Sequence, residues 1–107
     1  MNTVAFVGRI VKEVELRNVG EDRLVTNNVL AVRKTFKKDG SSDADFIPFV
    51  VWGKKAEILE KFCNKGDLIA LNGKMQSRTY QTNDKDTKYV VEMLVEDIEF
   101  IQKKSKN

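Results

Sequence analysis

The hydrophobic and polar positions of this chain repeat mostly with the period of a β-strand. Five stretches are rich in apolar and β-branched residues and are separated by polar or glycine-containing segments. One stretch changes to helical spacing, with apolar positions at Ile58, Leu59, Phe62 and Cys63. The predicted strands cover residues 4–11, 24–33, 45–52, 68–80 and 88–101, and the predicted helix covers residues 54–63.

The order of these elements, three strands, a helix and two strands, predicts the fold. It fits an all-β protein with one short helix, arranged as a five-stranded Greek-key barrel of the oligonucleotide/oligosaccharide-binding type (OB-fold). Glycines inside strands often mark bulges or tight bends, and Gly8 and Gly73 lie in the first and fourth predicted strands. We expect one domain, residues 1–102, followed by a short basic tail, residues 103–107.

The third predicted strand separates its side chains into two contrasting faces. Alternation places Ile47, Phe49 and Val51 on one face, which is apolar enough to be core. The other face then points outward and carries Phe46 and Trp52, roughly 20 Å apart, room for several bases of a single strand. This parity depends on the absence of a bulge at the proline between them. The alternative is that an oligomer partner buries both faces.

Cations accompany the exposed aromatics in two further places. Phe36 lies within residues 33–38, which hold four cations and no anion. On the fourth predicted strand, Tyr80 shares a face with two cations and an amide, a pattern suited to phosphate and base contacts. Solvated loops and strand faces are the simpler interpretation of both. The candidate stacking residues are Phe36, Phe46, Trp52 and Tyr80, and the candidate phosphate-binding residues are Arg33, Lys34, Lys37, Lys38, Lys54, Lys65, Lys74 and Arg78.

Composition narrows the function classes. The 107 residues carry 19 cations and 16 anions, no histidine and one cysteine, Cys63. The usual Cys/His zinc sites and a histidine general base are therefore excluded. We interpret the carboxylate clusters as solvated groups on loops and strand faces. We therefore expect no catalytic activity, metal or cofactor. No apolar run spans a membrane and no secretion signal opens the chain, so we expect a cytoplasmic protein.

Several short blocks, in the same order, resemble the bacterial and phage single-stranded DNA-binding proteins. The similarity runs from residue 1 to about 101. The blocks are Val7-Gly8-Arg9, Glu15-Leu16-Arg17, residues 28–32, Asp45-Phe46, residues 50–57, Lys65-Gly66, Gly73-Lys74 and residues 77–80. The resemblance implies that the four candidate aromatics are stacking positions and that cations near Lys54, Lys65 and Arg78 contact phosphates. It also implies a homo-oligomer, most often a tetramer, with the first strand in the subunit contacts.

The resemblance and the residue pattern predict the same function. We expect sequence-independent binding of single-stranded DNA, protecting single strands in replication, recombination and repair, in a bacterial cell or in a phage host. The family usually ends in an acidic tip that recruits other enzymes, whereas residues 103–107 are basic. This basic end fits either a truncated chain or a compact family member without the acidic tip. A primosome-type protein adaptor, a saccharide-binding barrel, a nuclease and a binder of single-stranded RNA are the alternatives.

Overall fold

The computed structural model describes residues 1–34 and 43–104 of the 107. These residues form six strands and one helix, and five of the strands and the helix follow the predicted order, with bounds within one residue of the predicted ones. The elements are β1 (Val4–Ile10), β2 (Arg17–Asn18), β3 (Leu24–Arg33), β4 (Ala44–Trp52), α1 (Lys54–Phe62), β5 (Leu68–Gln81) and β6 (Thr87–Gln102). The two-residue β2, which pairs with β3, is the element that the sequence pattern did not predict.

Five of the strands close into a barrel. In the sheet the order is β1-β5-β6-β4-β3-β2, and an additional pairing joins β1 to β3. The ring is therefore β1, β5, β6, β4 and β3, while β2 extends β3 outside it. The pairing of β4 with β6 is parallel and short, and the others are antiparallel. This arrangement confirms the predicted five-stranded Greek-key OB barrel.

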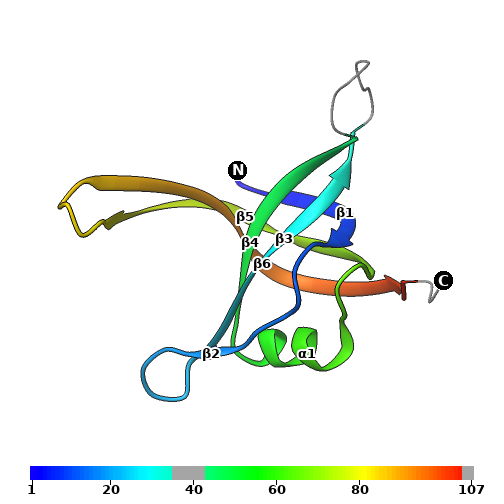
Figure 1. Ribbon diagram of the computed structural model, residues 1–107. Coiled ribbons are helices and arrows are strands. Elements are labelled where there is room, and N and C mark those ends of the chain that lie inside the picture. The colour runs from blue at the N-terminus through cyan, green and yellow to red at the C-terminus, as the bar shows by residue number, and fades with distance from the viewer. Residues whose placement is uncertain (35–42, 105–107) are drawn as a thin grey trace.

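The barrel interior and one side of α1 form a single hydrophobic core. Leu30 of β3 and Phe49 and Val51 of β4 are almost completely buried, and Ile47 is partly buried against them, so the predicted inner face of β4 packs on the core. From α1, which lies at one end of the barrel in Figure 1, Leu59 contributes to the same core. Phe62 of the same helix lies half exposed, with its ring edge-to-face against Phe100 rather than inside the core. No helix within the described ranges is long and apolar enough to cross a membrane.

The two predicted strand glycines have different uses. At Gly73 the register between β5 and β6 shifts, and a Cβ there would lie 2.0 Å from the carbonyl oxygen of Leu94. Gly73 therefore marks a β-bulge. At Gly8 the pairing with β5 stays regular, but a Cβ would lie 2.4 Å from the carbonyl oxygen of Ala31. Gly8 is thus a point where β1 crosses close to β3 as the barrel closes.

Beyond the bulge, β5 and β6 leave the barrel as a long two-stranded arm (Figure 1). The pairing continues from Gly73 to Gln81, which lies opposite Thr87. The radius of gyration of 15.0 Å exceeds the value of about 13 Å expected for a compact chain of this length, as a projecting arm requires.

Asp67 fastens the end of β6 to the segment that follows α1. Its carboxylate accepts hydrogen bonds from the backbone N–H groups of Asn64 (2.8 Å) and Lys104 (2.9 Å) and from the Lys103 ammonium (3.2 Å). Burial opposes ionisation of this carboxyl, but the donors outweigh it and hold the pKa of Asp67 below its usual value. Nearby, burial and the negative charge of Asp67 raise the pKa of Cys63 to about 11.

Candidate nucleic-acid interface

The outer face of β4 carries two exposed aromatic side chains. Phe46 is 58% exposed and Trp52 is 38% exposed, while Phe49 and Val51 of the opposite face are buried. The register with β3 is unbroken from Ala44 to Trp52, so the proline at position 48 introduces no bulge and the predicted parity holds. A rigid strand whose inner face is anchored in the core therefore presents both rings to solvent.

One residue of this outer face departs from the simple alternation. Val50 points outward with Phe46 and Trp52, yet it is only 4% exposed. The cause is the neighbouring β5–β6 pair, which approaches β4 through its contact with β6 and covers this position. The outer face of β4 therefore lies in a cleft at Val50 and is open to solvent at Phe46.

This cleft, which we call the Trp52 cleft, joins three parts of the barrel. It has a volume of about 290 Å³. Its lining comes from β4, from β3 with the preceding β2 region, and from the start of the arm: Arg17, Val19, Val25, Asn27, Val50, Trp52, Gln76, Arg78 and Glu92. The structure therefore brings together two of the predicted site residues, Trp52 and Arg78, from strands far apart in the sequence.

Two arginines at the cleft were not predicted as site residues. The guanidinium of Arg23 lies over the Trp52 ring, 4.9 Å from its centroid, and Arg17 donates a hydrogen bond of 2.9 Å to the amide oxygen of Asn27. A cation on an indole face is a favourable contact that leaves the charge available to a ligand. Arg23 precedes Val25, the partner of Trp52, by two residues, so the register of β3 with β4 brings the two side chains together and the local sequence pattern did not mark it.

The third arginine of the cleft, Arg78, is held by a carboxylate that the sequence reading did not single out. Glu92 is 4% exposed, and its Oε2 accepts from Arg78 Nε at 2.8 Å and from Gln76 Nε2 at 3.0 Å. A longer contact of 3.5 Å joins Arg78 Nη2 to Oε1. These hydrogen bonds and the negative charge of Glu92 raise the pKa of Arg78 further above its ordinary value.

The arm carries aromatic side chains on both of its faces. Tyr80 is 47% exposed and, two residues beyond Arg78 on β5, shares its face. Tyr89 is 77% exposed, lies opposite Thr79 and therefore belongs to the other face. Tyr89 lies in the strand predicted for residues 88–101 but is not among the predicted site residues.

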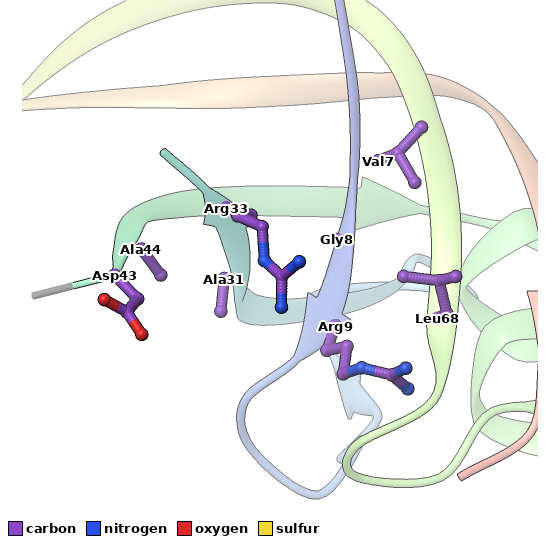
Figure 2. A pocket seen from close by; sticks show the side chains of 8 residues that line it. All are labelled: Val7, Gly8, Arg9, Ala31, Arg33, Asp43, Ala44 and Leu68. Carbon is purple, nitrogen blue, oxygen red and sulfur yellow. The ribbon is translucent and has the colours of Figure 1, made fainter. Parts of the chain in front are cut away.

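The other predicted cations lie apart from the Trp52 cleft. Arg33 lines a second cleft of about 440 Å³ between β1 and the β3–β4 hairpin, where Figure 2 shows it between Asp43 and Gly8. Lys34 forms an ion pair of 3.7 Å with Asp45. The remaining predicted cations that the structure describes are exposed, on α1, on the loop after it and on β5: Lys54, Lys65 and Lys74. Phe36, Lys37 and Lys38 lie outside the described residues.

The two clefts open on the same face of the β3–β4 pair. Arg33 lies opposite Ala44 at one end of the register, and Trp52 lies opposite Val25 at the other. Between them Phe46 lies opposite Ala31, with the same parity. An extended ligand following this face meets an aromatic ring, a second ring and then a guanidinium.

Comparison with known proteins identifies the family of this chain. The sequence model of the Single-strand binding protein family matches residues 1–101. The chain belongs to this family. A Single-stranded DNA-binding protein of Clostridium tetani is 43% identical over 103 residues, covering 95% of this chain and 71% of that protein. Single-stranded DNA-binding protein 3 of Clostridium acetobutylicum is 41% identical and covers all of this chain and 75% of that protein.

A solved structure of the same kind shares the fold of this single-strand binding family member. The Plasmodium falciparum SSB in a complex with ssDNA superimposes with a TM-score of 0.82, at 18% sequence identity, over 95% of this chain and 96% of that one. The agreement includes nearly the whole chain, so the barrel and its additions form one conserved architecture at low sequence identity.

Proposed function

We propose that this protein binds single-stranded DNA without sequence selection and protects it during replication, recombination and repair. The observation that carries the proposal is the outer face of the β3–β4 pair, where Phe46 and Trp52 stand exposed above a buried core. Base rings stack on aromatic faces whatever the base, because every base has a π-face. Membership of the single-strand binding family and the names of the relatives support the same ligand.

The proposed path starts at Trp52 and follows the outer face past Phe46 to Arg33. Tyr80 adds a ring on the arm, on the same face as Arg78. Exposed lysines on α1, on the loop that follows it and on β5 suit phosphates, since an ammonium group binds phosphate as a point charge. The proposed stacking residues remain Phe36, Phe46, Trp52 and Tyr80, and the proposed phosphate-contacting residues remain Arg33, Lys34, Lys37, Lys38, Lys54, Lys65, Lys74 and Arg78.

Oligomerisation belongs to the proposed mechanism. Stacking contributes about 1–3 kcal/mol per base, so four stacked bases give about 4–12 kcal/mol. Association and ordering cost about 4–15 kcal/mol, which leaves a single barrel with modest affinity. Linking barrels makes the later contacts intramolecular and raises the avidity by ~10²–10⁴. We propose a homotetramer, and the outer side of β1, where Val7 is 53% exposed, offers apolar surface for a subunit contact.

A fluorescence titration tests the proposed ligand directly. Trp52 is the only tryptophan of the chain, so its emission reports on the cleft alone. Adding oligo-dT is expected to quench the emission to saturation at a stoichiometric ratio, and a duplex of equal length serves as the matched control. Sedimentation of the same samples gives the mass of the complex. Absence of quenching with oligo-dT, or equal quenching with the duplex, refutes the proposal.

Two additions to this titration separate the alternative functions. Oligo-U in place of oligo-dT compares RNA with DNA. A labelled single strand incubated with the protein and Mg²⁺ tests for a nuclease, and we expect the strand to stay intact because the protein acts by binding. A protein adaptor would show weak quenching at micromolar oligonucleotide.

A further inference from the structure

A buried carboxylate in a cleft proposed for a polyanion calls for an explanation. Glutamate is rarely buried unless it is paired, because removing a charge from water is costly. Glu92 is 4% exposed and lines the Trp52 cleft beside Val50 and Trp52. A solvated glutamate on the far side of the barrel would repel the phosphates of a bound strand only weakly. Glu92, however, lies inside the proposed binding surface.

The contacts of Glu92 occupy the part of Arg78 that a phosphate would use. Arginine recognises phosphate and carboxylate through the same planar fork of N–H donors. In this structure Nε of Arg78 donates to Glu92 at 2.8 Å, and Nη2 makes the longer contact of 3.5 Å to the second oxygen. Gln76, two residues earlier on β5, donates to the same carboxylate at 3.0 Å and fixes its orientation. A phosphate must therefore compete with Glu92 for the Nε side of the guanidinium, while the Nη1 side makes no contact with Glu92.

Arg17, which also lines the cleft, and Arg23, which contacts Trp52, have different partners. Arg17 donates to the neutral amide of Asn27, and Arg23 lies over the ring of Trp52. Neither of these partners cancels a positive charge. The pairing with a buried anion thus distinguishes Arg78, although its side chain is 49% exposed and within reach of a ligand.

We propose that Glu92 limits the affinity of the interface by holding Arg78 as a positioned but charge-compensated donor. This role rests on the proposed binding of single-stranded DNA. Arg78 then orients the DNA strand next to Trp52 but releases no counterion from the DNA. The affinity for DNA therefore depends on stacking and on the other cationic side chains. Glu92 is a positioning residue, because it acts through Arg78.

The salt dependence of binding tests this role. The logarithm of affinity for a single strand falls with the logarithm of salt by about 0.7 for each phosphate neutralised. Glu92→Gln keeps the shape and one acceptor oxygen but removes the charge, so Arg78 becomes an additional phosphate cation. We expect tighter binding of labelled oligo-dT at low salt and a slope steeper by about 0.7, which is an additional loss of about 2.6-fold for a fourfold rise in salt.

A double-mutant cycle separates this role from a purely structural one. With Glu92 present, Arg78→Gln is expected to weaken binding while leaving the slope unchanged. In the Glu92→Gln background, the same substitution is expected to make the slope shallower by about 0.7. A buried group that only supports the fold changes stability and not this difference between slopes.

Asp97→Asn is the matched control for charge. Asp97 is exposed and paired with Lys55 at 3.8 Å, outside the Trp52 cleft, so its substitution is expected to leave the slope unchanged. The inference is overturned if Glu92→Gln leaves the slope as in the wild type, or if Arg78→Gln alone makes it shallower by about 0.7. Should Glu92→Gln fail to fold, as judged by circular dichroism, the Arg78→Gln result decides alone. Failure of the wild-type protein to bind oligo-dT refutes the proposed function instead.

Discussion

Replacing Trp52 by alanine removes one stacking platform and leaves the barrel core intact. The side chain is 38% exposed and points away from the core that Phe49 and Val51 occupy, so the substitution leaves no cavity inside the barrel. Loss of one stacked base is worth about 1–3 kcal/mol. Since about 1.4 kcal/mol corresponds to a tenfold change, the dissociation constant is expected to rise roughly 5- to 140-fold.

The assay is fluorescence anisotropy of labelled oligonucleotides, because the variant lacks the only tryptophan of the chain. Oligo-dT, oligo-dC and oligo-dA are measured separately at one salt concentration. Stacking predicts a loss for all three, whereas hydrogen-bond recognition of one base predicts a loss confined to it.

Phe62→Ala is the matched control for removing an aromatic side chain. Phe62 is 51% exposed, about as open to solvent as Phe46 and Tyr80, but it lies on α1 against Phe100 at a centroid distance of 6.3 Å. Its loss is expected to change stability slightly and DNA affinity less than twofold. A folded Trp52→Ala variant that binds all three oligonucleotides as tightly as the wild type refutes the stacking role.

Three further predictions concern the fold that supports this surface. Gly73→Ala places a Cβ 2.0 Å from a carbonyl oxygen of β6, so we expect the free energy of unfolding in urea to fall by about 1–3 kcal/mol. Folding lowers the pKa of Asp67, so the ionised carboxylate stabilises the fold fully above its unfolded pKa, and this stabilisation is lost as the pH falls through its folded pKa. The difference in free energy of unfolding between the wild type and Asp67→Asn should therefore narrow from pH 7 to pH 3. Cys63, buried with a pKa of about 11, should not react with a thiol reagent at pH 8 until urea unfolds the protein.

The elements of the barrel were predictable because their pattern is local. A strand alternates its side chains between two faces, so a run of about eight residues already distinguishes core from surface. For residues 24–33 the predicted strand coincides with β3. In β4 the alternation identified Phe49 and Val51 as core and Phe46 and Trp52 as exposed, which the burial of these residues confirms.

Features made by long-range contacts were not predictable in the same way. The two residues of β2 form a strand only because β3 pairs with them, and nothing in their own pattern marks them. The burial of Glu92 requires donors from β5, fourteen and sixteen positions away. Its sequence neighbourhood, crowded with other acidic residues, resembles a solvated face. The sequence contains the residues that pair in these contacts, but it does not show that folding brings them together.

The proposed stacking residues Phe46 and Trp52 lie on the barrel, whereas Tyr80 lies on the arm. This difference decides how much each is expected to contribute to the affinity for DNA. Trp52 and Phe46 belong to a strand whose opposite face packs into the barrel core, so their backbone is already fixed when DNA arrives. Tyr80 belongs to an arm in which residues 77–81 and 83–89 are exposed, and a two-stranded hairpin without a packed face is marginally stable alone. Ordering the arm on a strand of DNA costs entropy that the barrel does not incur. We therefore expect the same stacked base to contribute less net affinity at Tyr80 than at Trp52, so that the barrel face provides most of the affinity for DNA.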